Sequence, residues 1–147
     1  LWEALTLAQR FPEASDLCID LGSSPGGWTW VLASLGAKVI SVDKAPLADN
    51  VAKMDGVHYR QGSAFALKPS DLPEAEWLFS DVICYPDRLY QLVVQWLDAG
   101  YAGNIICTLK CQGPTDFEEI KLFRNIPGGR LLQLSHNKHE LTWMKIV

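Results

Sequence analysis

The chain has 147 residues, of which 48% are hydrophobic and 20% are charged, and its formal net charge is −4. This length and composition predict a single globular domain over 1–147 and exclude a disordered chain. No apolar run approaches the length of a membrane span, so no membrane partner is expected. Non-specific binding of nucleic acid needs clustered lysine and arginine, whereas the 13 basic residues are scattered. The domain is therefore not expected to hold nucleic acid by itself.

Strand-like and helix-like patterns alternate along the chain, which predicts an α/β fold with a mostly parallel sheet and helices on both faces. The first ten residues have the pattern of a helix end that stops near Pro12. The later elements follow in order: strands over 17–21 and 38–42, with a helix over 28–35 between them; a loop or short helix near 45–54; strands over 57–60 and 76–82; an amphipathic helix from Pro86 to Gly100; and a strand over 104–109.

The last third of the chain adds one helix and two strands. Thr115-x-x-Glu118 is a capping box that predicts a helix running to about Asn125. Strands are then predicted over 130–135 and 140–147. Only four residues separate them, which is too short for a parallel crossover, so the two strands must form an antiparallel hairpin.

A glycine-rich turn, Asp20 to Trp28, joins the first strand to the helix that follows it. A strand, such a turn and a helix N-terminus together make a site where backbone approaches a ligand closely. The next strand ends in Asp43, about 20 residues further on, where an acid can accept the hydroxyls of a ribose. The first third of the chain therefore predicts a pocket for a nucleoside-bearing cofactor.

The spacing within this turn bears on which cofactor it holds. The dinucleotide fingerprint has a glycine where this chain has Ser24, and the following Pro25 removes a backbone N–H that would face a phosphate. S-adenosylmethionine carries no phosphate, so the spacing favours it over a nicotinamide cofactor. A nicotinamide-dependent dehydrogenase stays as a distant alternative.

These residues, with three later ones at strand ends, resemble the FtsJ/RrmJ-like ribose 2′-O-methyltransferases, most closely the RlmM branch that modifies large-subunit ribosomal RNA. The resemblance covers nearly the whole chain. It implies a Rossmann-like methyltransferase fold with a seven-stranded sheet, and S-adenosylmethionine as cofactor. The positions that it implies for cofactor binding are Asp20, Gly22, Ser24, Pro25, Gly26, Gly27, Trp28, Asp43, Ser63 and Asp81. Ser63 departs from the family, which usually has an acid near the adenine.

The family works with a Lys–Asp–Lys–Glu set, and three members have counterparts here: Asp81, Lys110 and Glu140. In the RlmM-like pattern the first lysine precedes a Leu-x-Glu-Ala run, and this chain begins Leu1-Trp2-Glu3-Ala4. The expected lysine would thus precede Leu1, and the chain would be a fragment of a longer protein. The resemblance also implies a ribosomal RNA substrate and an RNA-binding domain upstream.

Methyl transfer to a ribose hydroxyl requires that a weak acid lose its proton as the new bond forms. Lys110 is the candidate base or hydroxyl-orienting group, Asp81 would orient it, and Glu140 would position the lysines. A lysine acts as a base only when neutral; burial and nearby positive charge lower its pKa, whereas paired carboxylates raise it. The sequence leaves the balance open. Tyr85 and Pro86 could stack on a substrate base or simply pack.

Two other interpretations remain. An RNA cytosine C5-methyltransferase would use a cysteine nucleophile, with Cys84 and Cys107 as candidates. A degenerate module would bind cofactor or RNA without turnover. The four cysteines are widely spaced, which fits a reduced, cytoplasmic setting and no zinc site. The histidines, His58, His136 and His139, are expected to be exposed loop or strand-end residues, and no metal is predicted.

Overall fold

The computed structural model describes residues 1–111 and 117–147 and contains one seven-stranded sheet. The strand order is β3-β2-β1-β4-β5-β7-β6. The first five strands of the chain run parallel, whereas β7 is antiparallel to both β5 and β6. The strands are β1 (Leu17–Leu21), β2 (Lys38–Asp43), β3 (Val57–Gln61), β4 (Ala75–Ser80), β5 (Ala102–Lys110), β6 (Gly129–Leu132) and β7 (Glu140–Lys145). The predicted fold class and the antiparallel hairpin are confirmed.

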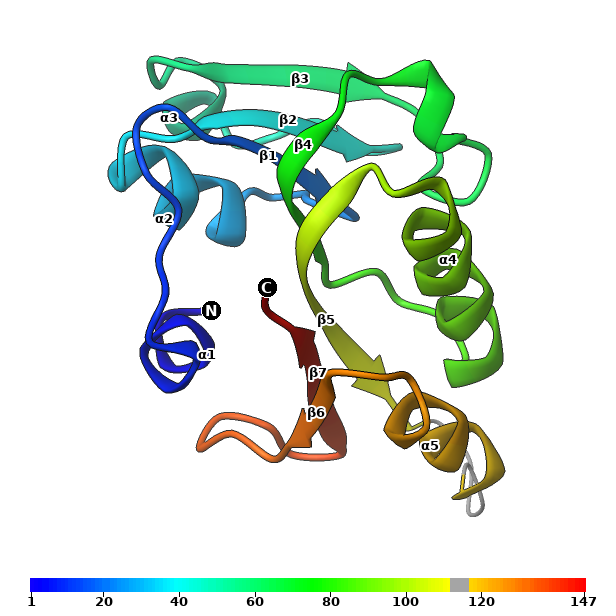
Figure 1. Cartoon of the computed structure of the whole chain (residues 1–147). Helices are drawn as coiled ribbons and strands as arrows, with labels where there is room; N and C mark the ends of the chain where they lie inside the picture. Colours follow the sequence, from blue (N-terminus) through cyan, green and yellow to red (C-terminus); the bar gives the residue numbers. More distant parts are fainter. Residues whose placement is uncertain (112–116) are drawn as a thin grey trace.

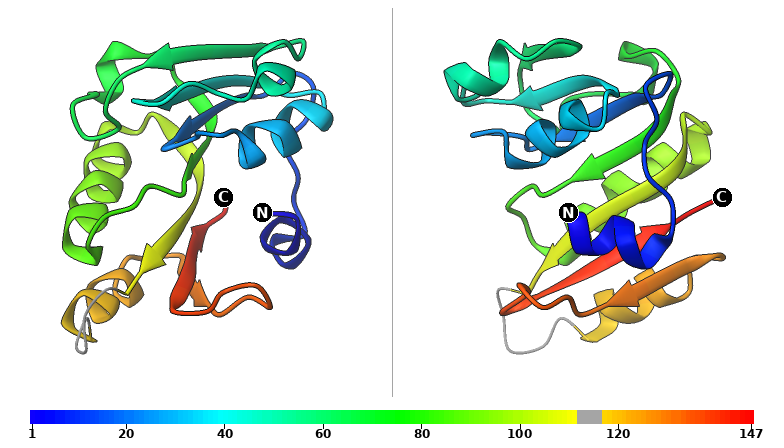
Figure 2. Two further views of the ribbon diagram at one scale, coloured as in Figure 1. Left: turned by 180° about the vertical axis from the view of Figure 1, so that it is seen from behind. Right: turned by 90° about the vertical axis from the view of Figure 1, so that its left-hand side faces the viewer.

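Helices cover both faces of the sheet (Figures 1 and 2). Two of them, α1 and α2, lie on one face, and α4 and α5 lie on the other. The bounds are α1 (Trp2–Ala8), α2 (Gly27–Ser34), α3 (Asp49–Ala52), α4 (Pro86–Ala99) and α5 (Phe117–Arg124), with a short 3₁₀ helix over Pro69–Asp71. No helix in the described residues is long and apolar enough to cross a membrane.

Each face of the sheet has its own hydrophobic core, because side chains along a strand alternate between faces. In β4, Trp77 and Phe79 are buried on the side of α1 and α2, where their rings stack 5.5 Å apart. Leu78 points the other way, into the core beneath α4 and α5. The apolar stripe predicted for α4 is buried there too, with Trp96 fully enclosed. This sandwich fixes the strand ends rigidly.

Several element boundaries differ from the sequence-based expectation, and the ends of β4 and β6 bear on the site. Strand β4 ends at Ser80, before the predicted end at residue 82, although the Asp81 N–H still donates to the Leu21 carbonyl at 3.3 Å. Strand β6 ends at Leu132 and not at residue 135, because the Ser135 N–H donates to the Glu3 carboxylate and leaves the ladder. The Thr115 half of the predicted capping box lies outside the described residues; α5 begins at Phe117.

Candidate functional site

The candidate site lies along one edge of the sheet, where the parallel strands end and β7 begins. Ligands of doubly wound sheets bind at the carboxyl ends of the strands. Because β7 runs antiparallel to β5, its first residue, Glu140, lies directly opposite Lys110, the last residue of β5. Asp43 ends β2, and Asp81 follows β4 directly. The topology thus gathers residues that lie far apart in the sequence.

The turn between β1 and α2 needs glycine at two positions. Gly22 has φ +75°, and a Cβ there would lie 2.8 Å from the Cα of Val82. Gly26 caps α2 with φ +117°, and a Cβ there would lie 2.9 Å from Cγ1 of Val51. Left-handed backbone and close packing together favour glycine. Gly27, the first residue of α2, has open space around its Cα and carries no such constraint.

Asp43 ties the turn to the segment after β2, because its two carboxylate oxygens accept hydrogen bonds from one residue of each. The Ser24 N–H donates to Oδ2 of Asp43 at 2.9 Å, and the Ala45 N–H donates to Oδ1 at 2.9 Å. The Ser24 hydroxyl donates to the Pro46 carbonyl at 2.8 Å, which ties the turn to the segment after β2. Each carboxylate oxygen can accept a further hydrogen bond. Asp43 therefore keeps acceptor capacity for a ligand.

Asp43 borders a cavity of about 230 Å³, which lies between β2 and the segments after β3 and β4. Its wall contains two sequence-predicted positions besides Asp43, namely Gly22 and Ser63. The Ser63 hydroxyl accepts a hydrogen bond from the Phe65 N–H at 3.2 Å, so it stays able to donate one. The full lining is Gly22, Asp43, Lys44, Gly62, Ser63, Ala64, Phe65, Val82, Ile83 and Arg88.

Asp20 lies behind the turn and is completely buried. Its Oδ2 accepts a hydrogen bond from the Thr29 hydroxyl at 2.7 Å, and that hydroxyl also contacts the Ser41 hydroxyl. Oδ1 has no hydrogen-bond partner among the described residues. Burial raises the pKa of Asp20 to about 7, against the opposing hydrogen bond from Thr29. Asp20 is therefore an internal anchor between β1 and α2 that stays partly protonated near neutral pH.

Asp81, Lys110 and Glu140 form one ionic cluster at the sheet edge. Nζ of Lys110 lies 2.9 Å from Oδ1 of Asp81 and 3.5 Å from Oε1 of Glu140. The Lys110 side chain is 18% exposed, and the two carboxylates are 38% and 37% exposed. Burial alone lowers the pKa of Lys110, but hydrogen bonds and charge from Asp81 and Glu140 outweigh it and raise the pKa. The two carboxylates therefore keep Lys110 an ammonium in the ligand-free chain.

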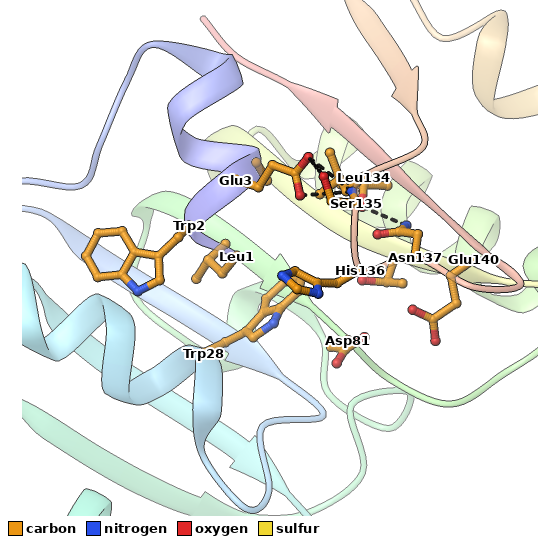
Figure 3. A pocket seen from close by; sticks show the side chains of 13 residues that line it. Leu1, Trp2, Glu3, Trp28, Asp81, Leu134, Ser135, His136, Asn137 and Glu140 are labelled. Atoms are coloured by element: carbon orange, nitrogen blue, oxygen red, sulfur yellow. Dashed lines mark hydrogen bonds between the residues drawn. The ribbon is translucent and has the colours of Figure 1, made fainter.

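A second cavity, of about 450 Å³, opens beside this cluster (Figure 3). It lies between α1, the start of α2 and the segment that joins β6 to β7. Trp28 forms part of its wall and packs edge-on against Phe79, with ring centroids 6.3 Å apart. The full lining is Leu1, Trp2, Glu3, Ala4, Trp28, Asp81, Thr108, Leu134, Ser135, His136, Asn137, Glu140 and Thr142.

Glu3 is a site residue that the sequence interpretation missed. Its carboxylate accepts hydrogen bonds from the Ser135 N–H at 3.0 Å and from the Ser135 hydroxyl at 2.9 Å (Figure 3). These bonds lower the pKa of Glu3. They fasten α1 to the segment that leads into Glu140. The Leu-x-Glu-Ala run was a signal for this residue, but it served only to locate the preceding lysine.

The alternative nucleophiles are poorly placed for thiolate chemistry. Cys107 is fully buried within β5, and this burial raises the pKa of its thiol. Cys84 is also buried, which raises its pKa to about 11. Tyr85 is exposed, whereas Pro86 is buried at the start of α4. Among the described residues, no group of three histidine, cysteine or acidic side chains could hold a metal ion.

Residues 3–121 match the model of the FtsJ-like methyltransferase family. The chain belongs to this family of methyltransferases, which implies S-adenosylmethionine as methyl donor. It is 33% identical over 136 residues to the ribosomal RNA large subunit methyltransferase M of Halorhodospira halophila, an alignment covering 89% of this chain and 40% of that protein. The chain thus spans about two fifths of the length of the curated relatives that it matches.

Solved structures show the same fold at lower sequence identity. A protein from Lactococcus lactis described as a hemolysin superimposes with a TM-score of 0.73 at 17% identity, covering 98% of this chain and 84% of that one. The fibrillarin pre-rRNA processing protein of Methanococcus jannaschii gives a TM-score of 0.69 at 16% identity, with 91% and 67% covered. At these identities the likeness concerns the fold alone.

Proposed function

We propose that the protein is an S-adenosylmethionine-dependent methyltransferase that modifies a ribose 2′-hydroxyl of large-subunit ribosomal RNA. The observation that carries this proposal is the position of Lys110 between Asp81 and Glu140, 2.9 and 3.5 Å away, at the ligand-binding edge of the sheet. The naming of the relatives as ribosomal RNA large subunit methyltransferase M supports the choice of substrate.

Two cavities at this edge suit the parts of S-adenosylmethionine. Asp43 and Ser63 border the smaller cavity, where a carboxylate and a hydroxyl suit the ribose hydroxyls and the adenine. Trp28 and Asp81 border the larger one, and the turn from Gly22 to Gly27 lets backbone come close between them. Ser24 and Pro25 keep this turn tied to the segment after β2 through Pro46 and Ala48. When bound, the cofactor supplies an electrophilic methyl group on a sulfonium.

The ionic cluster would bind and orient the ribose hydroxyl. Because the pKa of Lys110 is raised, it is an ammonium before the reaction and would donate a hydrogen bond to the ribose hydroxyl oxygen, which orients that hydroxyl. Asp81 and Glu140 fix the direction of that ammonium. To accept the hydroxyl proton at Nζ, Lys110 must first become neutral, and additional positive charge in the site would favour this by lowering its pKa.

A lysine before Leu1 would supply such charge and complete the family's set. Leu1 lines the larger cavity together with Asp81 and Glu140. A side chain on a preceding residue would therefore start beside the cluster. We also propose an RNA-binding domain upstream and a cytoplasmic location, the latter because the thiols of Cys18, Cys84 and Cys107 are unbridged.

The test is methylation of ribosomal RNA by the full-length protein with labelled S-adenosylmethionine, followed by alkaline hydrolysis. Methylation of a 2′-oxygen blocks its attack on the neighbouring phosphodiester, so the labelled position should survive as an alkali-resistant dinucleotide. Lys110→Ala should abolish the signal, and Cys84→Ser should leave it intact. Label on alkali-sensitive nucleotides that disappears in Cys84→Ser would instead establish C5 methylation of cytosine.

A further inference from the structure

A third cavity, of about 260 Å³, lies on the other side of the ionic cluster from the cofactor turn. It is lined by Lys110, Cys111, His136, Lys138, His139 and Glu140. Lys110 and Glu140 belong to the cluster itself, and His136 and Glu140 also border the larger cavity. The third cavity therefore borders the proposed reaction centre, and its other lining residues come from the β6–β7 connection and the end of β5.

The backbone of the β6–β7 connection is well anchored on both sides of Lys138. The Asn137 N–H donates to the Leu134 carbonyl at 3.0 Å, and the Asn137 side-chain amide donates to the Thr142 hydroxyl at 3.2 Å. On the far side of Lys138, the His139 carbonyl accepts a hydrogen bond from the Cys111 N–H at 3.1 Å. These bonds hold Lys138 and His139 beside the end of β5.

The charges of the side chains around this cavity indicate which kind of ligand it can bind. Asp81 and Glu140 carry two negative charges and Lys110 one positive charge, so the cluster has a net charge of about −1. In RNA, the phosphodiester on the 3′-oxygen is next to the 2′-hydroxyl, so a reacting ribose brings another negative charge within a few ångströms. Lys138 is exposed and makes no ion pair with any residue that the structure describes. Its ammonium is available to offset that charge.

We infer that this cavity, with Lys138 as its principal cation and the imidazoles of His136 and His139 as additional donors, binds the RNA phosphate next to the methylated ribose. The inference rests on the proposed function and names the residues that position its substrate. Lysine binds phosphate as a point charge, and neutral imidazoles donate through one ring nitrogen. Lys138 is thus a positioning residue for RNA and takes no part in holding the cofactor.

The experiment measures binding of a labelled single-stranded RNA of mixed sequence to the full-length protein across a series of KCl concentrations. Each phosphate contact contributes about 0.7 to the slope of log K against log salt for single strands. Lys138→Ala should weaken binding severalfold and lower the slope by about 0.7, and Lys138→Arg should restore most of both. Calorimetric binding of S-adenosylmethionine should be the same in all variants, which also verifies folding.

Lys38→Ala is the matched control, because Lys38 is an exposed lysine at the start of β2, on the opposite edge of the sheet. This variant should bind RNA with the slope of the wild type. If Lys138→Ala keeps the wild-type affinity and slope while the wild type methylates ribosomal RNA, the phosphate site is wrong and the proposed function stands. If the wild type neither binds nor methylates RNA, both proposals fall together.

Discussion

The substitution Asp20→Asn tests the electrostatics behind the cofactor turn. Asp20 is fully buried, and one of its carboxylate oxygens has no partner among the described residues. Burial raises its pKa from an ordinary 3.8 to about 7, and the charges of Asp81 and Asp43 contribute in the same direction. The difference between these two pKa values corresponds to a change of about 4 kcal/mol in the free energy of unfolding. That is a large share of the stability of a typical domain.

The sign of the effect follows from proton binding. Between about pH 4 and pH 7 the folded protein holds a proton on Asp20 that the unfolded chain has released. The free energy of unfolding therefore falls as the pH rises through this window and levels off above it. Asparagine keeps the shape of the side chain and still accepts the Thr29 hydrogen bond, but it cannot ionise. Relative to Asp20→Asn, the wild type should lose about 4 kcal/mol between pH 4 and pH 8.

Urea unfolding of both proteins at half-unit pH steps gives this difference directly. Other groups that titrate in this range contribute equally to both proteins and cancel. The exposed Asp98 on α4 supplies the control, because Asp98→Asn removes the same charge at the surface. Its pH profile should run parallel to that of the wild type. Parallel profiles for Asp20→Asn as well would refute the argument, since they would mean that Asp20 is ionised in the folded protein throughout the range.

Three further predictions concern other parts of the site. Lys110→Ala should lower the methylation rate by about 10²- to 10⁴-fold while leaving S-adenosylmethionine binding in place, as measured by single-turnover kinetics beside calorimetry; an unchanged rate would remove Lys110 from the mechanism. Gly22→Ala should lower the free energy of unfolding in urea by roughly 2 kcal/mol or more, because φ of Gly22 is +75° and the added Cβ would clash with the Cα of Val82. A variant as stable as the wild type would contradict this prediction. Glu3→Gln should speed hydrogen exchange at the Ser135 amide at neutral pH. The difference in exchange rate from the wild type should vanish as the pH falls through the lowered pKa of Glu3, because protonation of Glu3 weakens its hydrogen bonds with Ser135 in the wild type. A difference that persists in acid would show that charge on Glu3 is not the cause.

The sheet could be predicted because it follows from local pattern and chain direction, whereas the three members of the ionic cluster were identified through the resemblance to the family. The buried strand 104–109 is almost wholly apolar, and only four residues separate the last strand from the expected end of its hairpin partner. An antiparallel last strand was expected to begin at the same sheet edge as Lys110, and in the structure β7 pairs with β5 so that Glu140 lies opposite Lys110. The glycines of the turn could be recognised for a similar reason, since their backbone requirement is local.

The contact between Glu3 and Ser135 could not be predicted, because it joins segments 132 residues apart in the sequence. It also ends β6 early, so the error in that strand and the omission of Glu3 have one cause. The protonation of Lys110 was equally out of reach from sequence. It depends on whether burial or two carboxylates dominate, and only the distances of 2.9 and 3.5 Å decide that balance in favour of the carboxylates.

The distribution of charge also separates the possible cofactors without reference to any relative. Asp43, Asp81 and Glu140 all lie at this edge of the sheet. Lys110 is held by two of the three acids, and Lys44 and Arg88 line the cavity beside Asp43. A pyrophosphate beside Asp81 and Glu140 would meet negative charge that the single Lys110 ammonium does not fully offset. A sulfonium is instead attracted by the same carboxylates, and its ribose hydroxyls find acceptors in Asp43. The edge that favours a cationic methyl donor must, however, repel the phosphates of an RNA strand. For that reason a cation outside the cluster is required, and Lys138 at the β6–β7 connection meets the requirement.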